Sequence, residues 1–336
     1  MSPEGFKAAL AGCYAGLKSG AQTEALPAGA RVYEGKVRDV AFYGDRAVLA
    51  ASDRISAFDR VLSTIPWKGE ALTRISAWWF ERTADIVPNH LVAPAELGGY
   101  DPVRSSGRCV VARRLDMLPV ELVVRGYLTG SAWRDYRAGR PVSGLRLPAG
   151  LRYNERFPSP LVTPSTKEAS GHDRPCSGAE LVASGAVDAD TWHELERAAL
   201  ALFARGQELA ARRGLVLVDT KYEFGVYKGG LRLGDEIHTP DSSRYWYAEG
   251  YEQRFADGLE QRELDKEAFR RWLLARGFKG DGEPPAIPDE VRIETAMRYA
   301  QAYEAIIGEE FEPVCPDAQA AEVAAAYCLT EAFKAR

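Results

Sequence analysis

Near the start of the chain, short runs of apolar residues alternate with polar ones, and this period of two predicts β-strands. The runs cover residues 31–34, 37–43 and 46–52. Gly44-Asp45 lies between the last two runs and is typical of a two-residue hairpin turn, because glycine accepts a positive φ. Residues 70–86 then change to the helical spacing of apolar side chains. The sequence therefore predicts a β-meander followed by a helix.

Further strands and one loop are predicted in the middle of the chain. Residues 109–115 and 121–125 have the composition of strands, and the segment 116–119 that separates them ends in proline. Residues 157–167 contain three prolines, which lack a backbone N–H, so we expect a loop there rather than a helix or a central strand. Residues 215–218 are all Leu or Val and predict a buried strand.

Helices are the main prediction for the second half of the chain. Thr191 begins a sequence typical of a capping box, and the apolar spacing after it predicts a helix to about Arg213. We expect another helix to begin at the polar segment 241–244, with Asp241 as its N-cap residue. Helical periodicity is also present in the segments 263–276, 289–307 and 317–335.

Strands and helices follow one another in irregular order, so we expect an α+β fold rather than a regular doubly wound sheet. A chain of 336 residues is long enough for two domains. We divide it into a β-rich lobe over residues 1–116, a larger α/β lobe over 117–262, and a C-terminal helical extension over 263–336 that packs on the lobes.

The composition is that of a globular protein, since 46% of the residues are apolar and 27% are charged. The net charge of −5 includes no large basic excess, which argues against a general nucleic-acid-binding protein. No apolar run approaches the ~20 residues that span a bilayer, and the first ten residues lack the apolar core of a secretory signal. The five cysteines are scattered and form no CxxC pair. We expect a cytoplasmic protein that binds neither nucleic acid nor membranes and needs no obligate protein partner.

Charged residues occupy alternate positions after the predicted strand at 215–218. Asp219, Lys221 and Glu223 would share one face of an extended chain. A turn at Gly229-Gly230 would place Glu223 opposite the second residue of Asp235-Glu236, and such opposed like charges destabilise a sheet. Binding of Mg²⁺ through the phosphates of a nucleotide would explain these acids. A solvent-exposed charged hairpin explains them equally well.

Three other segments combine features that suit an anionic ligand. The turn at 35–38 (GKVR) joins a glycine to two cations, although most such turns have no ligand. The loop at 125–131 (RGYLTGS) joins an arginine to two hydroxyl groups, and a glycine-broken loop is the simpler interpretation. The segment 235–244 places acids before a predicted helix start, where free N–H groups bind anions. His172 lies in a polar loop, where it is either a substrate contact or a surface histidine.

Two long motifs carry a resemblance to a known family. Residues 118–131 (LPVELVVRGYLTGS) and 216–225 (VLVDTKYEFG) resemble the two signatures of the phosphoribosylaminoimidazole-succinocarboxamide synthase (SAICAR synthetase) family. The remaining blocks of that family are resembled in the same order by residues 33–39, 51–59, 163–167 and 241–244. The similarity is dense over residues 30–250 and looser in the helical tail.

The resemblance implies an amide-forming ligase of de novo purine biosynthesis. Such an enzyme joins L-aspartate to carboxyaminoimidazole ribonucleotide (CAIR) with MgATP, and gives SAICAR, ADP and phosphate. A carboxylate is a poor electrophile, so phosphorylation to an acyl phosphate is the expected first step. The family fold is α+β, with a β-rich nucleotide lobe and a larger substrate lobe. A small-molecule kinase with a related nucleotide lobe and a non-catalytic nucleotide-binding module are the alternatives.

The same resemblance implies roles for individual residues. Catalysis is assigned to Lys221 and Arg125, and Mg²⁺ to Glu223 and Asp235. ATP is assigned to Gly35, Lys36, Arg38, Leu115 and Met117, where the last two belong to a hinge that receives adenine. Substrate binding is assigned to Arg125, Ser131, Arg244, Asp241, Asp53, Arg54, Ser165 and Lys167.

Overall fold

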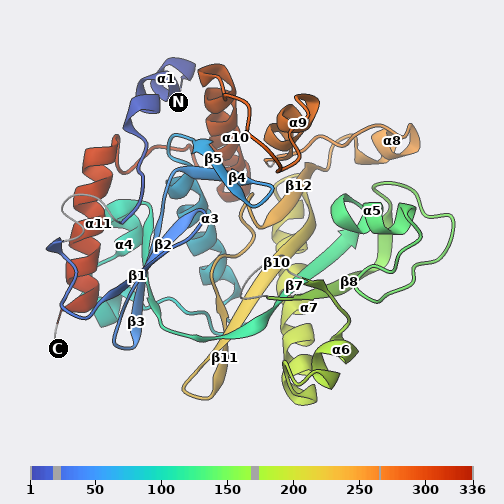
Figure 1. Cartoon of the computed structure of the whole chain (residues 1–336), viewed down its shortest axis with the longest axis horizontal. Coiled ribbons are helices and arrows are strands. Elements are labelled where there is room, and N and C mark those ends of the chain that lie inside the picture. Colours follow the sequence, from blue (N-terminus) through green and yellow to red (C-terminus); the bar gives the residue numbers. More distant parts are fainter. Residues whose placement is uncertain (1, 18–23, 168–173, 265, 335–336) are drawn as a thin grey trace. The chain divides into compact units, whose positions relative to one another are not determined.

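The computed structural model describes residues 2–17, 24–167, 174–264 and 266–334 (Figure 1). The chain divides into two compact units. The first unit consists of Met1–Trp78, His90–Arg114 and Asp265–Arg336, and the second of Trp79–Asn89 and Leu115–Leu264. Each unit therefore contains segments that are far apart in the sequence.

The first unit contains an antiparallel sheet in the order β1-β2-β3-β6. The meander predicted from the sequence is confirmed, and Gly44 in the turn between β2 and β3 has a φ of +61°. A separate two-stranded hairpin, β4-β5, completes the strands described in this unit. The strands are β1 (Arg31–Glu34), β2 (Arg38–Tyr43), β3 (Arg46–Ala51), β4 (Arg54–Ala57), β5 (Arg60–Thr64) and β6 (Cys109–Arg113).

Helices from both ends of the chain pack in the first unit. Helix α11 contacts β3 and β6 and covers one face of their sheet (Figure 1), where Val48, Val111 and Leu329 are buried in a common core. The predicted C-terminal helices are confirmed, and that of 289–307 has the predicted bounds. The helical segments are α1 (Pro3–Ala9), η1 (Leu10–Gly12), η2 (Pro94–Leu97), α4 (Pro102–Ser106), α9 (Glu267–Ala275), α10 (Asp289–Ile307) and α11 (Ala318–Phe333).

Helix α3 (Lys68–Thr83) belongs to both units, because the division falls after Trp78. The helix predicted over 70–86 is confirmed, but it begins two residues earlier and ends three residues earlier. Leu72, Ile75 and Trp79 are buried, as their helical spacing predicts.

The second unit contains an antiparallel sheet in the order β11-β10-β7-β8-β9, and β12 pairs with the first half of β10. Helix α7 packs on this sheet against β10 (Figure 1), and Leu195, Ala199 and Leu202 are buried on its inner side. The elements are β7 (Asp116–Tyr127), α5 (Gly130–Arg137), β8 (Arg156–Thr166), β9 (Arg174–Pro175), α6 (Gly178–Ala183), α7 (Ala189–Ala211), β10 (Leu215–Tyr227), β11 (Gly230–Gly234), β12 (Ser243–Tyr247) and α8 (Tyr251–Ala256). The α+β class is confirmed.

Two proline-containing segments were wrongly predicted to lie outside strands. The break expected at 116–119 is the first part of β7, and the loop expected at 157–167 is β8. Strand β8 pairs with β7 on one side, and among the described residues its other side meets only the two residues of β9. Most of β8 is therefore an edge, where the missing N–H of a proline removes no ladder hydrogen bond.

Two helix starts were also wrongly predicted. The segment 241–244 does not begin a helix; Ser243 begins β12, because pairing with the central strand β10 outweighs a local capping signal. Helix α7 begins at Ala189, and its N-cap is Asp188, whose side chain accepts a hydrogen bond from the Thr191 N–H. Among the described residues, no helix combines the length and the apolar character needed to cross a membrane.

Candidate active site

The hairpin formed by β10 and β11 has a different register from the predicted one. Its two-residue turn is Lys228-Gly229, both with positive φ, and Tyr227 pairs with Gly230. Moving the turn by one residue moves every cross-strand partner by two, so Glu223 lies opposite Gly234 and not opposite Glu236. The predicted repulsion between Glu223 and Glu236 across the hairpin is therefore wrong.

Glu223 has its like-charged neighbour on the other side of β10. It lies directly opposite Glu121 of β7. The ammonium group of Lys221 lies between the two acids, with Nζ 2.9 Å from Glu121 Oε1 and 2.7 Å from Glu223 Oε1. The Nζ of Lys167 also donates to Glu223 and lies 3.8 Å from Glu121. Two acids and two lysines form one cluster, which we call the Lys221 cluster.

Burial would raise the pKa of Glu223, but Lys221 and Lys167 outweigh burial and lower this pKa to about 2. Burial opposes the charge on Lys221 in the same way, but Glu223, Glu121 and Asp235 raise its pKa above the ordinary value. Lys221 is therefore a permanent cation near neutral pH, with a side chain 33% exposed. The charges of Glu121 in β7, Glu223 in β10 and Asp235 in the segment after β11 therefore all stabilise the same ammonium group.

Replacing Glu223 with Gln should destabilise the fold by about 2 kcal/mol at pH 7, because a charge-assisted contact is lost. The folded pKa of Glu223 lies below the unfolded value of about 4.3, so its stabilising contribution is complete above that value and disappears as the pH falls toward 2. The difference in the free energy of unfolding between the wild type and Glu223→Gln, measured with urea, should therefore shrink below about pH 4.5. The exposed Glu194→Gln change is the control. A difference that does not change with pH would contradict the ion pairs.

Glu223 and Asp235 supply only some of the ligands that a magnesium ion needs. Among the described residues there is no group of three or more His, Cys, Asp or Glu side chains placed to hold a metal ion. Mg²⁺ is commonly bound by one or two carboxylates together with substrate phosphates, so Glu223 and Asp235 suit an ion that arrives with a nucleotide. Magnesium binding by this pair stays a prediction.

Two arginines meet one buried acid beside the Lys221 cluster. Arg125 of β7 donates from Nε to Thr163 Oγ1 (2.9 Å), from Nη2 to Ser131 Oγ (3.2 Å) and from Nη1 to Asp219 Oδ2 (3.4 Å). Arg244 of β12 donates to the same oxygen of Asp219. Burial lowers the pKa of Arg125 and Asp219 counteracts this. These residues, which we call the arginine cluster, present two guanidinium groups with one balancing carboxylate.

The start of α5 lies against the arginine cluster. Gly130 has a φ of +58°, and a Cβ at this position would lie 2.5 Å from Nη2 of Arg244. Only glycine therefore allows the guanidinium of Arg244 to approach the first turn of α5, which also carries Ser131. Unpaired N–H groups at a helix start and two arginines are suited to the same kind of ligand, an anion with several oxygens.

The predicted adenine hinge lies at the start of the longer segment of the second unit, Leu115–Leu264. The side chains of Leu115 and Met117 lie beside Gly234, where an added Cβ would be 3.3 Å from Leu115 Cδ1 and 3.4 Å from Met117 Cε. Gly225 has Leu115 Cβ even closer, at 2.8 Å from such an atom. Two glycines thus leave a bare backbone surface beside two apolar side chains, of which Met117 is 45% exposed.

The first unit contains the other predicted nucleotide residues. Lys36 is exposed and forms an ion pair with Asp59 at 2.6 Å. The N–H of Gly35 donates to the Arg38 carbonyl at 2.9 Å, and a Cβ on Gly35 would lie 2.4 Å from that oxygen. The tight turn therefore requires glycine here and leaves Lys36 at the surface.

Asp53 and Arg54 are held by protein atoms in the described structure. Asp53 is buried and accepts hydrogen bonds from the N–H of Tyr14 (2.8 Å) and from Arg108 (3.2 Å). Arg54 donates to the Gly35 carbonyl (2.9 Å) and so supports the glycine turn. Their predicted role in substrate binding stays a prediction.

The remaining predicted residues lie near the two clusters in sequence or register. Ser165 pairs with Glu121 across β7 and β8, and Asp241 is half-buried in the segment between β11 and β12. His172 lies outside the described residues.

The sequence did not predict roles for Glu121, Asp219 and Thr163, although alternation along β10 had already placed Asp219 on the face of Lys221.

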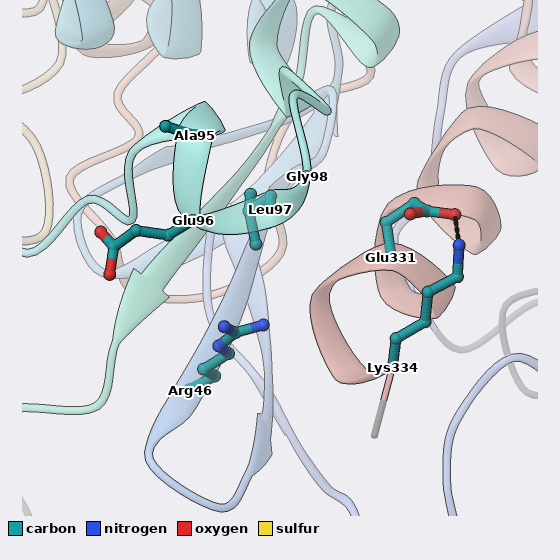
Figure 2. A pocket seen from close by; sticks show the side chains of 7 residues that line it. All are labelled: Arg46, Ala95, Glu96, Leu97, Gly98, Glu331 and Lys334. Atoms are coloured by element: carbon teal, nitrogen blue, oxygen red, sulfur yellow. Dashed lines mark hydrogen bonds and ion pairs between the residues drawn. The ribbon is translucent and has the colours of Figure 1, made fainter. Parts of the chain in front are cut away.

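A pocket of about 620 Å³ lies elsewhere in the first unit. Figure 2 shows the η2 residues on one side, with Arg46 below them, and the α11 residue Glu331, which pairs with Lys334, on the other side. Arg46 donates to the Ala332 carbonyl at 2.7 Å. The pocket contains none of the predicted site residues, so we assign no role to it. Its lining residues are Arg46, Ala95, Glu96, Leu97, Gly98, Glu331 and Lys334.

Comparisons with known proteins agree on one family. Residues 31–285 match the family model described as SAICAR synthetase. The phosphoribosylaminoimidazole-succinocarboxamide synthase of Bacteroides thetaiotaomicron is 47% identical over 292 residues, which cover 85% of this chain and 90% of the relative.

Solved structures give the same result. The structure titled SAICAR-synthase from Saccharomyces cerevisiae complexed with SAICAR matches with a TM-score of 0.71 and 31% identity, over 85% of this chain and 98% of that chain. A SAICAR synthetase (Type-2) in complex with ADP matches with a TM-score of 0.63 and 26% identity, over 84% of this chain and 100% of that one.

Proposed function

Because the chain belongs to the SAICAR synthetase family and is an ATP-dependent ligase of purine biosynthesis, we propose that the Lys221 cluster and the arginine cluster are its active site. The observation that carries this proposal is the pairing of β7 with β10, which places Arg125 opposite Asp219 and Glu121 opposite Glu223. Both signature motifs of the sequence thereby contribute to one face of one sheet.

The arginine cluster binds the ribonucleotide CAIR in this proposal. Arg125, Arg244 and Ser131 supply donors for its phosphate and carboxylate oxygens, and the first turn of α5 adds backbone N–H groups. Asp219 keeps the two guanidinium groups oriented while the site is empty. The SAICAR-complexed yeast relative supports a ligand of this class.

The Lys221 cluster handles the reacting groups. A carboxylate oxygen of CAIR attacks the γ-phosphorus of ATP, ADP leaves, and the aspartate amine then displaces phosphate from the acyl carbon and loses a proton. The ammonium of Lys221 offsets negative charge beside the reacting oxygens. Glu223 and Asp235 would hold Mg²⁺, which neutralises the phosphates when bound. Lys36 and the Gly35 turn, with Arg38, would contact ATP phosphates, and Leu115 and Met117 the adenine.

The remaining assignments follow from the same family pattern. We propose that residues 1–116 bind ATP and that residues 117–262 bind substrate and metal. Asp53, Arg54, Ser165, Lys167 and Asp241 would contribute to substrate binding. We place the protein in the cytoplasm, with CAIR and L-aspartate as its small-molecule partners.

One isotope experiment tests the function and the acyl phosphate together. With CAIR labelled by ¹⁸O in its carboxylate, each amide formed should release one ADP and one phosphate that contains one ¹⁸O atom, because the attacking oxygen leaves with phosphorus. Mass spectrometry measures both products, and CAIR and L-aspartate are omitted in turn. Unlabelled phosphate would contradict the acyl phosphate. ADP release that continues at the full rate without aspartate, with the phosphoryl group kept on the acceptor, would support a kinase.

A further inference from the structure

His238 is a fully buried side chain in the loop of residues 235–242, which joins β11 to β12. Its ring packs edge-on against Trp79, with ring centroids 4.6 Å apart. It also lies against the backbone of α7 at Gly206, where an added Cβ would be 2.5 Å from Cε1 of His238. Tyr222 of β10 lies on a third side, with its hydroxyl oxygen 2.6 Å from Nε2. The chemistry proposed above uses none of these groups.

The backbone of the loop is also held by its neighbours. The hydroxyl of Tyr245 donates to the His238 carbonyl at 2.8 Å, and the N–H of Lys221 donates to the Ser242 carbonyl at 2.9 Å. Asp235 and His238 have φ values of +56° and +53°. Residues other than glycine keep such a conformation only where their surroundings impose it. The shape of the loop is therefore imposed from β10 and β12.

One tautomer accounts best for the hydrogen bonds of His238. Burial lowers its pKa to about 3 and raises the pKa of Tyr222 well above the ordinary value, so an uncharged imidazole meets an uncharged phenol. Nδ1 has no hydrogen-bond partner among the described residues. If Tyr222 donates to Nε2, the Nδ1–H alone lacks a partner. If Nε2–H donates, both Nδ1 and the Tyr222 hydroxyl hydrogen lack partners, which buried groups avoid.

We propose that His238 is a positioning residue, which accepts a hydrogen bond from Tyr222 and so fixes the loop against β10 with Asp235 beside Lys221. Tyr222 lies between Lys221 and Glu223 in the sequence, with its side chain on the buried face of the same strand. The hydrogen bond therefore joins β10, which carries Glu223, to the loop that carries Asp235. It lies on the face of β10 opposite to the Lys221 cluster. This inference rests on the proposed role of Asp235 with Glu223.

The test compares Tyr222→Phe, His238→Phe and the double variant in the amide-forming assay. Tyr222→Phe removes one hydroxyl group, so it should lower kcat about tenfold and raise the Mg²⁺ concentration for half-maximal rate by a similar factor. His238→Phe should lower kcat at least as much. The double variant should be no worse than His238→Phe, because both changes remove the same hydrogen bond.

Tyr251→Phe is the matched control. Its buried hydroxyl donates to the Asn154 carbonyl at 2.9 Å, a contact in the same unit that involves no residue of the loop. It should lower the melting temperature about as much as Tyr222→Phe, with kcat and Mg²⁺ dependence unchanged. A residue that only stabilises the fold would not change the Mg²⁺ dependence.

Nitrogen NMR of protein labelled with ¹⁵N-histidine gives a second readout. The His238 signals, identified by their loss in His238→Phe, should show a protonated Nδ1 and a hydrogen-bonded Nε2 that shifts in Tyr222→Phe. Unchanged kcat and Mg²⁺ dependence in Tyr222→Phe, additive losses in the double variant, or equal losses in Tyr251→Phe would overturn the proposal. A wild-type protein that makes no amide would instead contradict the proposed function.

Discussion

Replacing Lys221 with Met should lower kcat by about 100-fold or more, because removal of one preorganised donor at a developing charge has effects of that size. The side chain is permanently charged and lies 2.9 Å from Glu121 and 2.7 Å from Glu223. Methionine keeps most of the volume and removes the charge. Steady-state kcat at saturating ATP, CAIR and L-aspartate measures the effect. Lys228→Met, in the exposed hairpin turn, removes the same charge outside the cluster and should leave kcat unchanged.

A loss of folding must be separated from a loss of catalysis in this variant. Without the ammonium of Lys221, Glu121 and Glu223 face each other across β7 and β10 with Lys167 as the remaining cation, so the melting temperature should fall. The second change Glu121→Gln removes one of the two acids. The double variant should therefore recover melting temperature but not kcat. Recovery of kcat together with stability would mean that Lys221 only balances the acids.

The Lys221 cluster shows which part of a site can be predicted from sequence. Alternation along an extended strand predicts that Asp219, Lys221 and Glu223 share one face. The structure confirms this for Lys221 and Glu223, whose side chains are in contact. That rule is local and depends only on backbone geometry. The partners Glu121 and Lys167 come from other strands, 100 and 54 positions away from Lys221, and nothing local indicates them.

The hairpin after β10 shows how a small local error becomes a large one. Lys228-Gly229 and Gly229-Gly230 are both reasonable two-residue turns, since glycine dominates such positions. Lysine takes a φ of +51° in the observed turn, a conformation that sequence preference does not favour. The choice of turn decides whether Glu223 faces Gly234 or an acid, and so whether the hairpin is repulsive.

The strands β8 and β12 show the limit of local signals. Asp241 with the following serines is a good helix start, and the prolines of 157–167 are poor strand residues. Pairing with β10 and β7 decides both segments, because a long central strand offers more hydrogen bonds than a local cap. Arg244 and Thr163 reach the arginine cluster only through these pairings, so their contacts could not be predicted from local pattern.

Replacing Arg125 with Met should lower kcat/KM for CAIR by about 100-fold, because a buried charge-assisted contact to an anion contributes on the order of 1.5–3 kcal/mol. Arg125 contacts Thr163, Ser131 and Asp219 at once, through three nitrogens of a planar fork. We expect KM for MgATP to change by less than about twofold, since the residue is assigned to the ribonucleotide.

Arg125→Lys distinguishes charge from geometry at this position. Lysine keeps the positive charge but offers a single ammonium group, which cannot meet three partners in the directions that the guanidinium does. The lysine variant should therefore recover only part of the lost kcat/KM, whereas Arg137→Met, at an exposed position of α5, should stay near the wild type. Full recovery by lysine would mean that charge alone matters. A rise in KM for MgATP larger than the rise in KM for CAIR would place Arg125 at the ATP site. A residue that binds only CAIR cannot weaken ATP binding more than it weakens CAIR binding.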